Sequence, residues 1–84
     1  MSPNGERYDP ERFTAAHSNL PFATWVQVTR LDGGGRTVVV RINDRCSGSK
    51  KIIDLSEAAA RQLDMIRAGS VRVRLQVVTA PGRE

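Results

Sequence analysis

A run of mostly β-branched residues, Thr37-Val38-Val39-Val40-Arg41-Ile42, constrains the fold of this chain more than any other segment. A strand this rich in Val and Ile is normally buried. The run continues into Asn43 and Asp44, so it delivers a carboxyl group to the rim of a hydrophobic core. Partial removal of water at such a rim favours acid/base chemistry. The sequence therefore predicts a buried strand with a candidate acid where it ends.

Alternation of apolar and polar residues predicts a β-hairpin that contains this run. In residues 24–30, Val26 and Val28 occupy one face of a half-buried strand and polar residues occupy the other. The glycine-rich turn Asp32-Gly33-Gly34-Gly35 then leads into the return strand, residues 37–43. The core face of the return strand is expected to hold Val38, Val40 and Ile42.

The second half of the chain predicts a short strand, a helix and a last long strand. Residues 52–54 form the short strand, and Ser56 is placed to cap a helix over residues 57–64. Residues 71–78 alternate clearly and predict the last strand. The buried faces are expected to hold Leu55, Ala59 and Leu63 around the helix, and Val71, Val73, Leu75 and Val77 on the last strand.

The length and composition indicate one small domain. Its 84 residues, of which 39% are hydrophobic, form a single unit over residues 1–84, with residues 79–84 as a loose tail. Three long strands, one short strand and one helix are too few for a sandwich and favour a compact barrel that closes its own edges. No apolar run approaches the roughly 20 residues that a membrane-spanning helix needs.

The charge and the single cysteine limit the partners. The net charge is +4, which favours a polyanion such as nucleic acid, an anionic membrane or an acidic wall polymer, or serves only solubility. No signal peptide is recognised, so the protein is cytosolic or its chain begins after a removed signal. Cys46 cannot form an internal disulfide and is free or paired with another chain. No histidine stands at metal-ligand spacing from it, so we expect no metal and no cofactor.

Several short motifs follow one another at compatible spacings between residue 4 and about residue 78. They are Asn4-Gly5-Glu6-Arg7-Tyr8-Asp9, Thr14-Ala15-Ala16-His17, Leu20-Pro21-Phe22, Val26-Gln27-Val28-Thr29, Val38-Val39-Val40-Arg41-Ile42-Asn43-Asp44-Arg45 and Ile52-Ile53-Asp54-Leu55-Ser56-Glu57-Ala58-Ala59-Ala60. Together they resemble the rare lipoprotein A (RlpA) family. The resemblance implies a mainly β fold, a six-stranded double-psi β-barrel with one short helix, related to the barwin and expansin domains. It also implies a bacterial envelope protein, in the periplasm, on the outer membrane as a lipoprotein or secreted, that binds peptidoglycan.

Some members of the family are lytic transglycosylases that cut glycan strands lacking stem peptides. Their catalytic Glu, His and Asp match Glu6, His17 and Asp44 of this chain. The family usually has a further strand upstream of Asn-Gly-Glu, so the first strand is expected to be missing, truncated or supplied by another copy. The family's Gly-Pro-Phe after Asp-Arg is replaced here by Cys46-Ser47-Gly48, which changes one wall of the cleft.

The chemistry of the reaction suggests a role for each candidate. Cleavage of a glycosidic bond needs a proton for the leaving oxygen and stabilisation of an oxocarbenium-like state. In a lytic transglycosylase the sugar's own 6-hydroxyl attacks, so one acid that also serves as base is sufficient. We expect Asp44 to be that acid/base. Glu6 would stabilise charge or position the sugar, and His17 would hydrogen-bond a carboxyl or the substrate. The candidates for substrate contact are Arg45, Tyr8, Asn43 and Lys50.

Each candidate has a plainer alternative. Asp44 can instead end the strand as a turn-former, Glu6 can be a solvated charge, and His17 can be a structural histidine. Asp54 is expected to be structural, holding the turn before Ser56. The remaining side chains also have two open interpretations. Tyr8 and Phe22 stack on a sugar or pack in the core, and Trp25 is an exposed platform or is covered. Arg45, Lys50 and Lys51 bind a polymer or face solvent.

The first functional hypothesis is therefore a glycan-cleaving barrel acting on peptidoglycan. The second is a binding module of the same fold without turnover, as in expansin-like proteins. Nucleic acid is not expected as a partner, because the sequence shows no aromatic readout motif or recognition helix. A homodimer, strand-swapped or linked through Cys46, is a further expectation.

Overall fold

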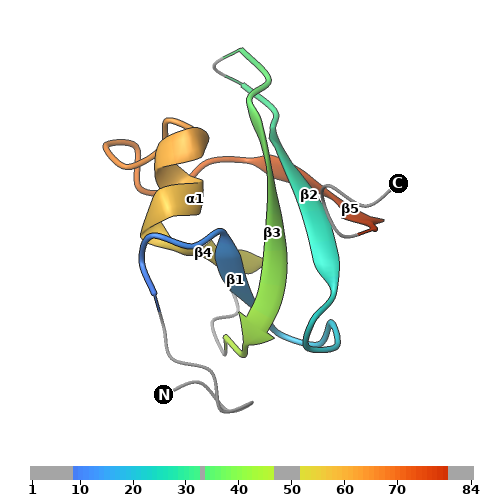
Figure 1. Cartoon of the computed structure of the whole chain (residues 1–84). Helices are drawn as coiled ribbons and strands as arrows, with labels where there is room; N and C mark the ends of the chain where they lie inside the picture. The colour runs from blue at the N-terminus through green and yellow to red at the C-terminus, as the bar shows by residue number, and fades with distance from the viewer. Residues whose placement is uncertain (1–8, 33, 47–51, 80–84) are drawn as a thin grey trace.

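The computed structural model describes residues 9–32, 34–46 and 52–79 of the chain. Within these residues five strands form one sheet in the order β4-β1-β3-β2-β5, and one helix, α1, packs against β3. The sheet curls strongly, so that the structure resembles a half-barrel with α1 beside it (Figure 1). The bounds in chain order are β1 Thr14–His17, β2 Trp25–Arg30, β3 Thr37–Asp44, β4 Ile53–Leu55, α1 Glu57–Gln62 and β5 Val73–Val78.

The predicted hairpin forms the centre of this sheet. β2 and β3 pair antiparallel, with Val26 opposite Val40 and Val28 opposite Val38. These four side chains and Ile42 are at most 6% exposed, which confirms the predicted core faces of both strands. In the connecting turn, Gly34 and Gly35 have φ angles of 101° and 70°, a region that residues with a Cβ rarely adopt. The β-branched run therefore occupies the most buried position in the fold.

The motif that contains His17 forms a strand that alternation did not predict. β1 pairs parallel with β3 on one side and antiparallel with β4 on the other. A four-residue strand that includes two alanines has too short a pattern for a period of two to be recognised. Its position between β3 and β4 is set by these neighbours, and Ala15, at 4% exposure, joins the core.

The helix is shorter than expected, but its cap is confirmed. α1 ends at Gln62 instead of residue 64, and the Ser56 hydroxyl accepts the backbone N–H of Ala59 as an N-cap. Ala59 and Leu63 are fully buried, as predicted for the helix face. β4 runs one residue later than the predicted strand of residues 52–54, so that it includes Leu55, which is half-buried.

The last strand ends at Val78 as predicted, but it differs from its prediction at its start and in the exposure of one residue. β5 begins at Val73 and not at residue 71, and Val77 is 62% exposed although its alternation favoured the core. Val77 lies opposite the fully buried Val26 in the sheet. β5 is the last strand of the sheet, so within the described residues no further strand covers the outer flank of Val77. Alternation therefore identified the face of the strand but not how much of that face is covered.

The sheet does not close within the described part of the chain, because its two edge strands, β4 and β5, are not paired with each other. A mostly apolar hollow of about 580 Å³ lies between them. Its wall includes Leu31, Ile52 and Ile66, which are each more than half exposed. None of the helices in residues 9–32, 34–46 and 52–79 is long and apolar enough to cross a bilayer.

Arg30 joins the end of β2 to the C-terminal end of α1. Its Nη1 donates to the carbonyl oxygens of Leu63 and Asp64 at 3.0 and 2.7 Å, and its Nε lies 2.7 Å from the Asp32 carboxylate. The side chain is only 14% exposed. The last carbonyl groups of a helix have no hydrogen-bond donor within the helix. Arg30 supplies a donor to the carbonyl groups of Leu63 and Asp64.

We expect Arg30→Met to lower the free energy of unfolding by about 2 kcal/mol, because hydrogen bonds to a charged group contribute about 1.5–3 kcal/mol. Urea denaturation followed by circular dichroism would measure the change. The matched control is Arg74→Met, because Arg74 is exposed on β5. An equal loss in both variants would contradict the role given to Arg30.

Candidate active site

A second, smaller hollow lies where β3 ends. It has a volume of about 270 Å³ and is bounded by β1, the end of β3, β4 and the cap of α1. Its lining residues are Thr14, Ala15, Ala16, Asn43, Asp44, Asp54, Leu55 and Ser56. It has two carboxyl groups at its wall, Asp44 and Asp54, whereas the apolar hollow between the edge strands has only Asp54, which lines both hollows. This hollow is the candidate site.

A β-bulge brings Asp44 into the hollow. The parallel register between β1 and β3 shifts after Ala15, which pairs with Ile42, so that Ala16 pairs with Asp44 and Asn43 is the extra residue. Bulges redirect side chains and occur often beside active sites. Asn43 is 6% exposed at this point, and Asp44 is half-buried. The predicted acid at the strand end is therefore confirmed in position, whereas the bulge that aims it was not predicted.

Asp54 shares the hollow with Asp44. Ala16 pairs with Asp44 on one side and with Asp54 on the other, so both acids stand on the same face of the sheet as Ala16. Neighbouring strands are about 4.8 Å apart, which separates the two Cα atoms by about 10 Å across β1. Glycosidic bond cleavage commonly uses two carboxyl groups in one site, and this hollow has two at its wall.

Asp54 does not have the structural role predicted for it, which was to hold the turn before Ser56. Here Asp54 is exposed at the hollow, and the Ser56 hydroxyl instead bonds to Arg12, Thr14 and Ala59. The signal that would have revealed Asp54 is the pairing of β4 with β1, and both strands are too short to predict this pairing from alternation.

Asp44 also has the turn-forming contact that the plainer alternative predicted. Its Oδ1 accepts the backbone N–H of Arg45 at 2.8 Å. This bond orients the carboxyl group but occupies only one of its two oxygens. Asp44 is therefore both the end of the strand and a group with an oxygen that can act in the hollow.

His17 lies at the last position of β1, one residue beyond Ala16, and is not among the residues that line the hollow. Its Nδ1 accepts the backbone N–H groups of Asn19 and Leu20, both at 3.1 Å. The imidazole is thus held through Nδ1 by the turn that follows β1. This contact agrees with the alternative that His17 is a structural histidine. The structure brings His17 to the end of β1 beside the hollow but not into its wall.

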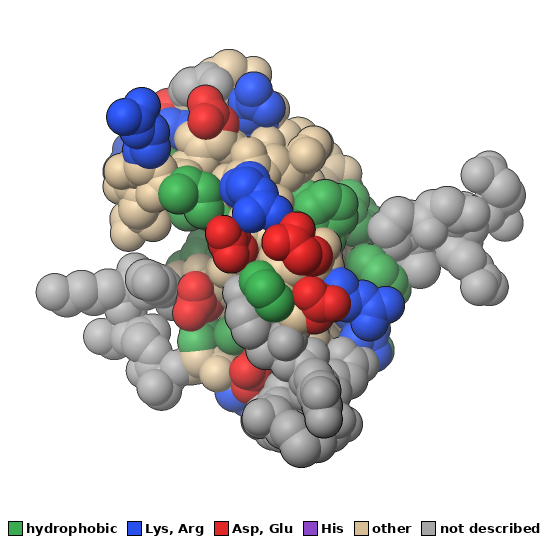
Figure 2. All heavy atoms as spheres, turned by 60° about the vertical axis from the view of Figure 1, so that its left-hand side comes forward, with side chains coloured by type: hydrophobic (Ala, Val, Ile, Leu, Met, Phe, Trp, Pro, Cys, Tyr) green, Lys and Arg blue, Asp and Glu red, His purple; other side chains and the backbone are tan. Residues whose placement is uncertain are grey.

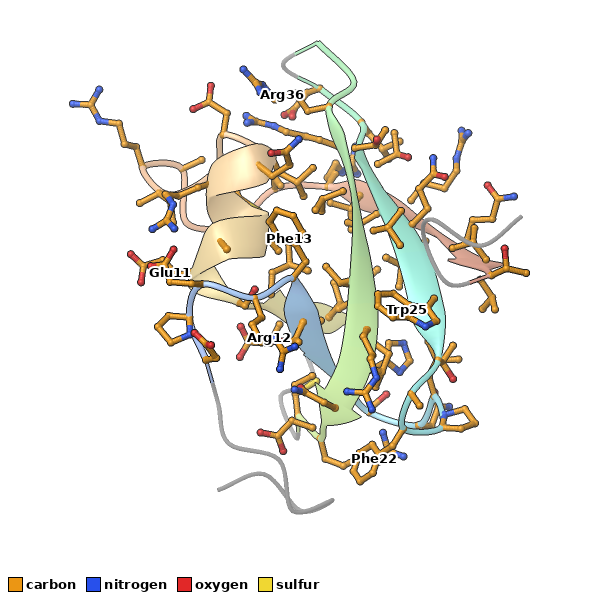
Figure 3. The ribbon with its side chains drawn as sticks, viewed as in Figure 1. Glu11, Arg12, Phe13, Phe22, Trp25 and Arg36 are labelled. Carbon is orange, nitrogen blue, oxygen red and sulfur yellow. The ribbon has the colours of Figure 1, made fainter. Side chains whose placement is uncertain are left out.

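Several predicted site residues lie outside the described part of the chain. These are Glu6, Tyr8, Lys50 and Lys51, so their proposed roles are unchanged predictions. Among the described candidates, Phe22 is half-buried and packs against the core while its ring also faces the Arg45 guanidinium. Trp25 is half-buried on β2 (Figure 3). Cys46 is a free, half-buried thiol.

The surface around α1 carries both signs of charge. Figure 2 shows acidic and basic side chains interleaved on this face, with no single basic patch. Arg61 accounts for part of this pattern, since it pairs with Glu11 at 2.8 Å and with Glu57 at 3.1 Å. Within residues 9–32, 34–46 and 52–79, no group of three or more His, Cys, Asp or Glu side chains is placed to hold a metal ion. Any partner of this face therefore meets a mixed surface.

Comparison with known proteins identifies the family of this chain. A double-psi β-barrel family model described as lytic transglycolase matches residues 2–75. The chain is 53% identical over 75 residues to the probable endolytic peptidoglycan transglycosylase RlpA of Nostoc sp. (strain PCC 7120), a match that covers 88% of this chain and 20% of that protein. It is 45% identical over 80 residues to the endolytic peptidoglycan transglycosylase RlpA of Vibrio cholerae (94% and 30%) and 49% identical over 76 residues to that of Campylobacter jejuni (89% and 27%).

The fold and the site define a small, mainly β domain whose curled sheet presents one carboxylate at the end of a central buried strand and another on an edge strand. This chain belongs to the double-psi β-barrel family of lytic transglycolases, as the family match over residues 2–75 shows. The predicted RlpA resemblance and fold class are thereby confirmed. The chain spans about a fifth to a third of the length of the relatives named above.

Proposed function

We propose that this domain binds the glycan strands of peptidoglycan in the hollow at the end of β3 and cleaves them as a lytic transglycosylase. The observation that carries the proposal is the position of Asp44 and Asp54 on either side of Ala16, both lining that hollow. The family match and the names of the relatives support the substrate class. Peptide-free strands are the proposed substrate, because the resemblance to the RlpA family implies glycan strands that lack stem peptides.

Asp44 acts first as the acid and then as the base in this proposal. Its carboxyl proton moves to the glycosidic oxygen as the bond from that oxygen to C1 breaks. The 6-hydroxyl of the same sugar then attacks C1, and its proton returns to the Asp44 carboxylate. An anhydro ring forms, no water is consumed, and Asp44 ends in its starting state.

The positive charge that develops at C1 needs a negative group nearby. Asp54, exposed on the opposite side of the hollow, is placed for this role. Glu6, for which the family resemblance implies a catalytic role, is the other candidate and lies outside the described residues. Asn43, buried at the bulge, is proposed as a hydrogen-bonding contact for the sugar.

The proposed location is the bacterial envelope, because peptidoglycan is found there. Periplasmic, lipoprotein and secreted forms all satisfy this requirement. The homodimer expected from the sequence, strand-swapped or linked through Cys46, stays a prediction. Two features are relevant to it: the free Cys46 thiol and the unpaired edges of β4 and β5 within the described residues.

The test is incubation of the protein with purified, peptide-free glycan strands, followed by mass spectrometry. We expect shorter strands with anhydro ends, each lighter by one water than the product of hydrolysis. Products that carry the added water would show that the domain hydrolyses the glycosidic bond, and the transglycosylase proposal would be wrong. Intact strands, under conditions in which the protein sediments with sacculi, would show binding without cleavage.

A non-catalytic, expansin-like binding module is the second candidate. The observation that favours it is the position of His17 outside the wall of the hollow, since the family's catalytic set includes this histidine. Binding to sacculi that loosens no strands and releases no fragments would support this candidate. Binding to DNA that weakens steeply with salt, with none to sacculi, would contradict both candidates.

A further inference from the structure

The guanidinium of Arg45 is held by its own chain. Its Nη1 donates to the carbonyl oxygen of Leu20 at 2.6 Å and to that of His17 at 3.2 Å. Its Cζ lies 4.3 Å from the centre of the Phe22 ring, a stacking contact that suits the planar guanidinium. Figure 3 shows Phe22 near the end of the sheet where β3 finishes. Arg45, the residue after Asp44, therefore connects the end of β3 to the turn that follows β1.

The same turn holds the ring of His17. The backbone N–H groups of Asn19 and Leu20 both donate to Nδ1, each at 3.1 Å. In a neutral imidazole, a nitrogen that accepts hydrogen bonds carries no proton, so the proton is on Nε2. Leu20 is bonded at both ends, because its N–H contacts the imidazole and its carbonyl contacts Arg45.

This turn requires support from outside itself. Ala23 has a φ of 71°, a left-handed conformation that is unfavourable for a residue with a Cβ. The N–H of Ala23 donates to the carbonyl of Ile42 at 2.7 Å, and the N–H of Ile42 donates to the carbonyl of Thr24 at 2.8 Å. These bonds hold the end of the turn on β3. Arg45 holds the beginning of the turn, because its guanidinium donates to the carbonyl oxygens of His17 and Leu20.

We infer that Arg45 is a positioning residue for His17 and not a glycan contact. Arg45 keeps the 17–22 turn in the shape in which two N–H groups point at Nδ1, and this fixes His17 as the tautomer that donates from Nε2. The kinetic part of this inference rests on the proposed function, whereas the tautomer does not. His17 then presents one defined donor, which is what the role expected from the sequence, a hydrogen bond to a carboxyl or to the substrate, requires.

Nitrogen-15 NMR of the imidazole tests the inference directly, because His17 is the only histidine in the chain. In the wild-type protein at a pH where the ring is neutral, we expect Nδ1 to be unprotonated, with the Nε2–H tautomer favoured at least about 10-fold by two hydrogen bonds. In Arg45→Gln the signals should move toward those of a free imidazole. Arg74→Gln removes the same charge from an exposed position on β5 and should leave them unchanged.

Kinetics on glycan strands supply the second readout. Arg45→Gln should lower kcat about 10-fold with little change in KM, because misplacing a catalytic group costs rate more than binding. Arg45→Lys keeps the charge but loses the planar fork, so its tautomer signals should lie between those of Arg45→Gln and the wild type. If Arg45→Gln does not fold, Arg45→Lys decides by the same NMR measurement.

Two results would overturn the inference. One is a wild-type ring protonated on Nδ1, and the other is unchanged imidazole signals in Arg45→Gln. A raised KM beside the second result would make Arg45 a substrate contact. A wild-type protein that cleaves no glycan would refute the proposed function alone. In that case the tautomer shift would still decide whether Arg45 positions His17.

Discussion

Asp44→Asn is expected to lower the rate of glycan cleavage about 1,000-fold while leaving the fold and glycan binding nearly unchanged. A carboxamide neither gives nor takes the proton that the reaction moves, and general acid–base catalysis contributes about 100- to 10,000-fold. The Asn side chain has almost the same shape, and its amide oxygen can still accept the N–H of Arg45 that Oδ1 accepts at 2.8 Å. Rates of anhydro-end formation and sedimentation with sacculi would measure the two effects separately.

Two other aspartates provide the comparison for this variant. Asp54→Asn removes the opposite carboxylate of the hollow and should lower the rate about 10-fold, because it removes favourable charge without removing the acid. Asp64→Asn makes the same chemical change in the turn after α1, where Asp64 is exposed with a φ of 56° that Asn tolerates well, and should have no effect. A larger loss in Asp54→Asn than in Asp44→Asn would transfer the acid/base role to Asp54.

The central hairpin could be predicted because its signals are local. Val26 and Val28 on one strand, and Val38 and Val40 on the next, show a period of two that depends only on their own segments. The Gly34 turn between them is equally local. The position of a carboxyl group at the end of β3 follows from the same run, without knowledge of its neighbours.

The candidate site could be predicted only in part, because its geometry depends on strand pairing between distant segments. The bulge at Asn43 exists only in the register of β3 against β1. Asp54 enters the hollow because β4 pairs with the other side of β1. Arg45 was expected at the substrate, but its contacts with Leu20 arise because β3 ends beside the turn after β1. None of these relations leaves a pattern in a single segment.

Ser56→Ala is expected to lower the free energy of unfolding by about 2–3 kcal/mol. Loss of an N-cap costs about 0.5–2 kcal/mol, and loss of further buried hydrogen bonds adds about 1 kcal/mol. The Ser56 hydroxyl donates to the carbonyl of Arg12 at 2.6 Å and accepts the N–H groups of Thr14 and Ala59, both at 3.3 Å. The residue is 2% exposed, so water does not replace these partners.

This loss is large for a domain of this size, because a small core rarely supplies more than about 3–5 kcal/mol of net stability. The hydroxyl joins the entry to β1, the end of β4 and the first turn of α1, which are three of the segments around the hollow. We therefore expect Ser56→Ala to reduce glycan cleavage in parallel with the folded fraction. Glycan oligomers that bind the hollow should restore part of the stability by mass action.

Equilibrium urea denaturation would measure the change, with an unaltered m-value showing that the surface exposed on unfolding is the same. Ser70→Ala is the matched control, since Ser70 is exposed in the connection between α1 and β5 and its substitution should stay within about 0.5 kcal/mol. A change below about 1 kcal/mol in Ser56→Ala would mean that Thr14, whose N–H also donates to the carbonyl of Arg12 at 3.1 Å, holds this junction without the hydroxyl. The stability of the hollow would then depend on the backbone pairing of β1 and β4 and not on the cap.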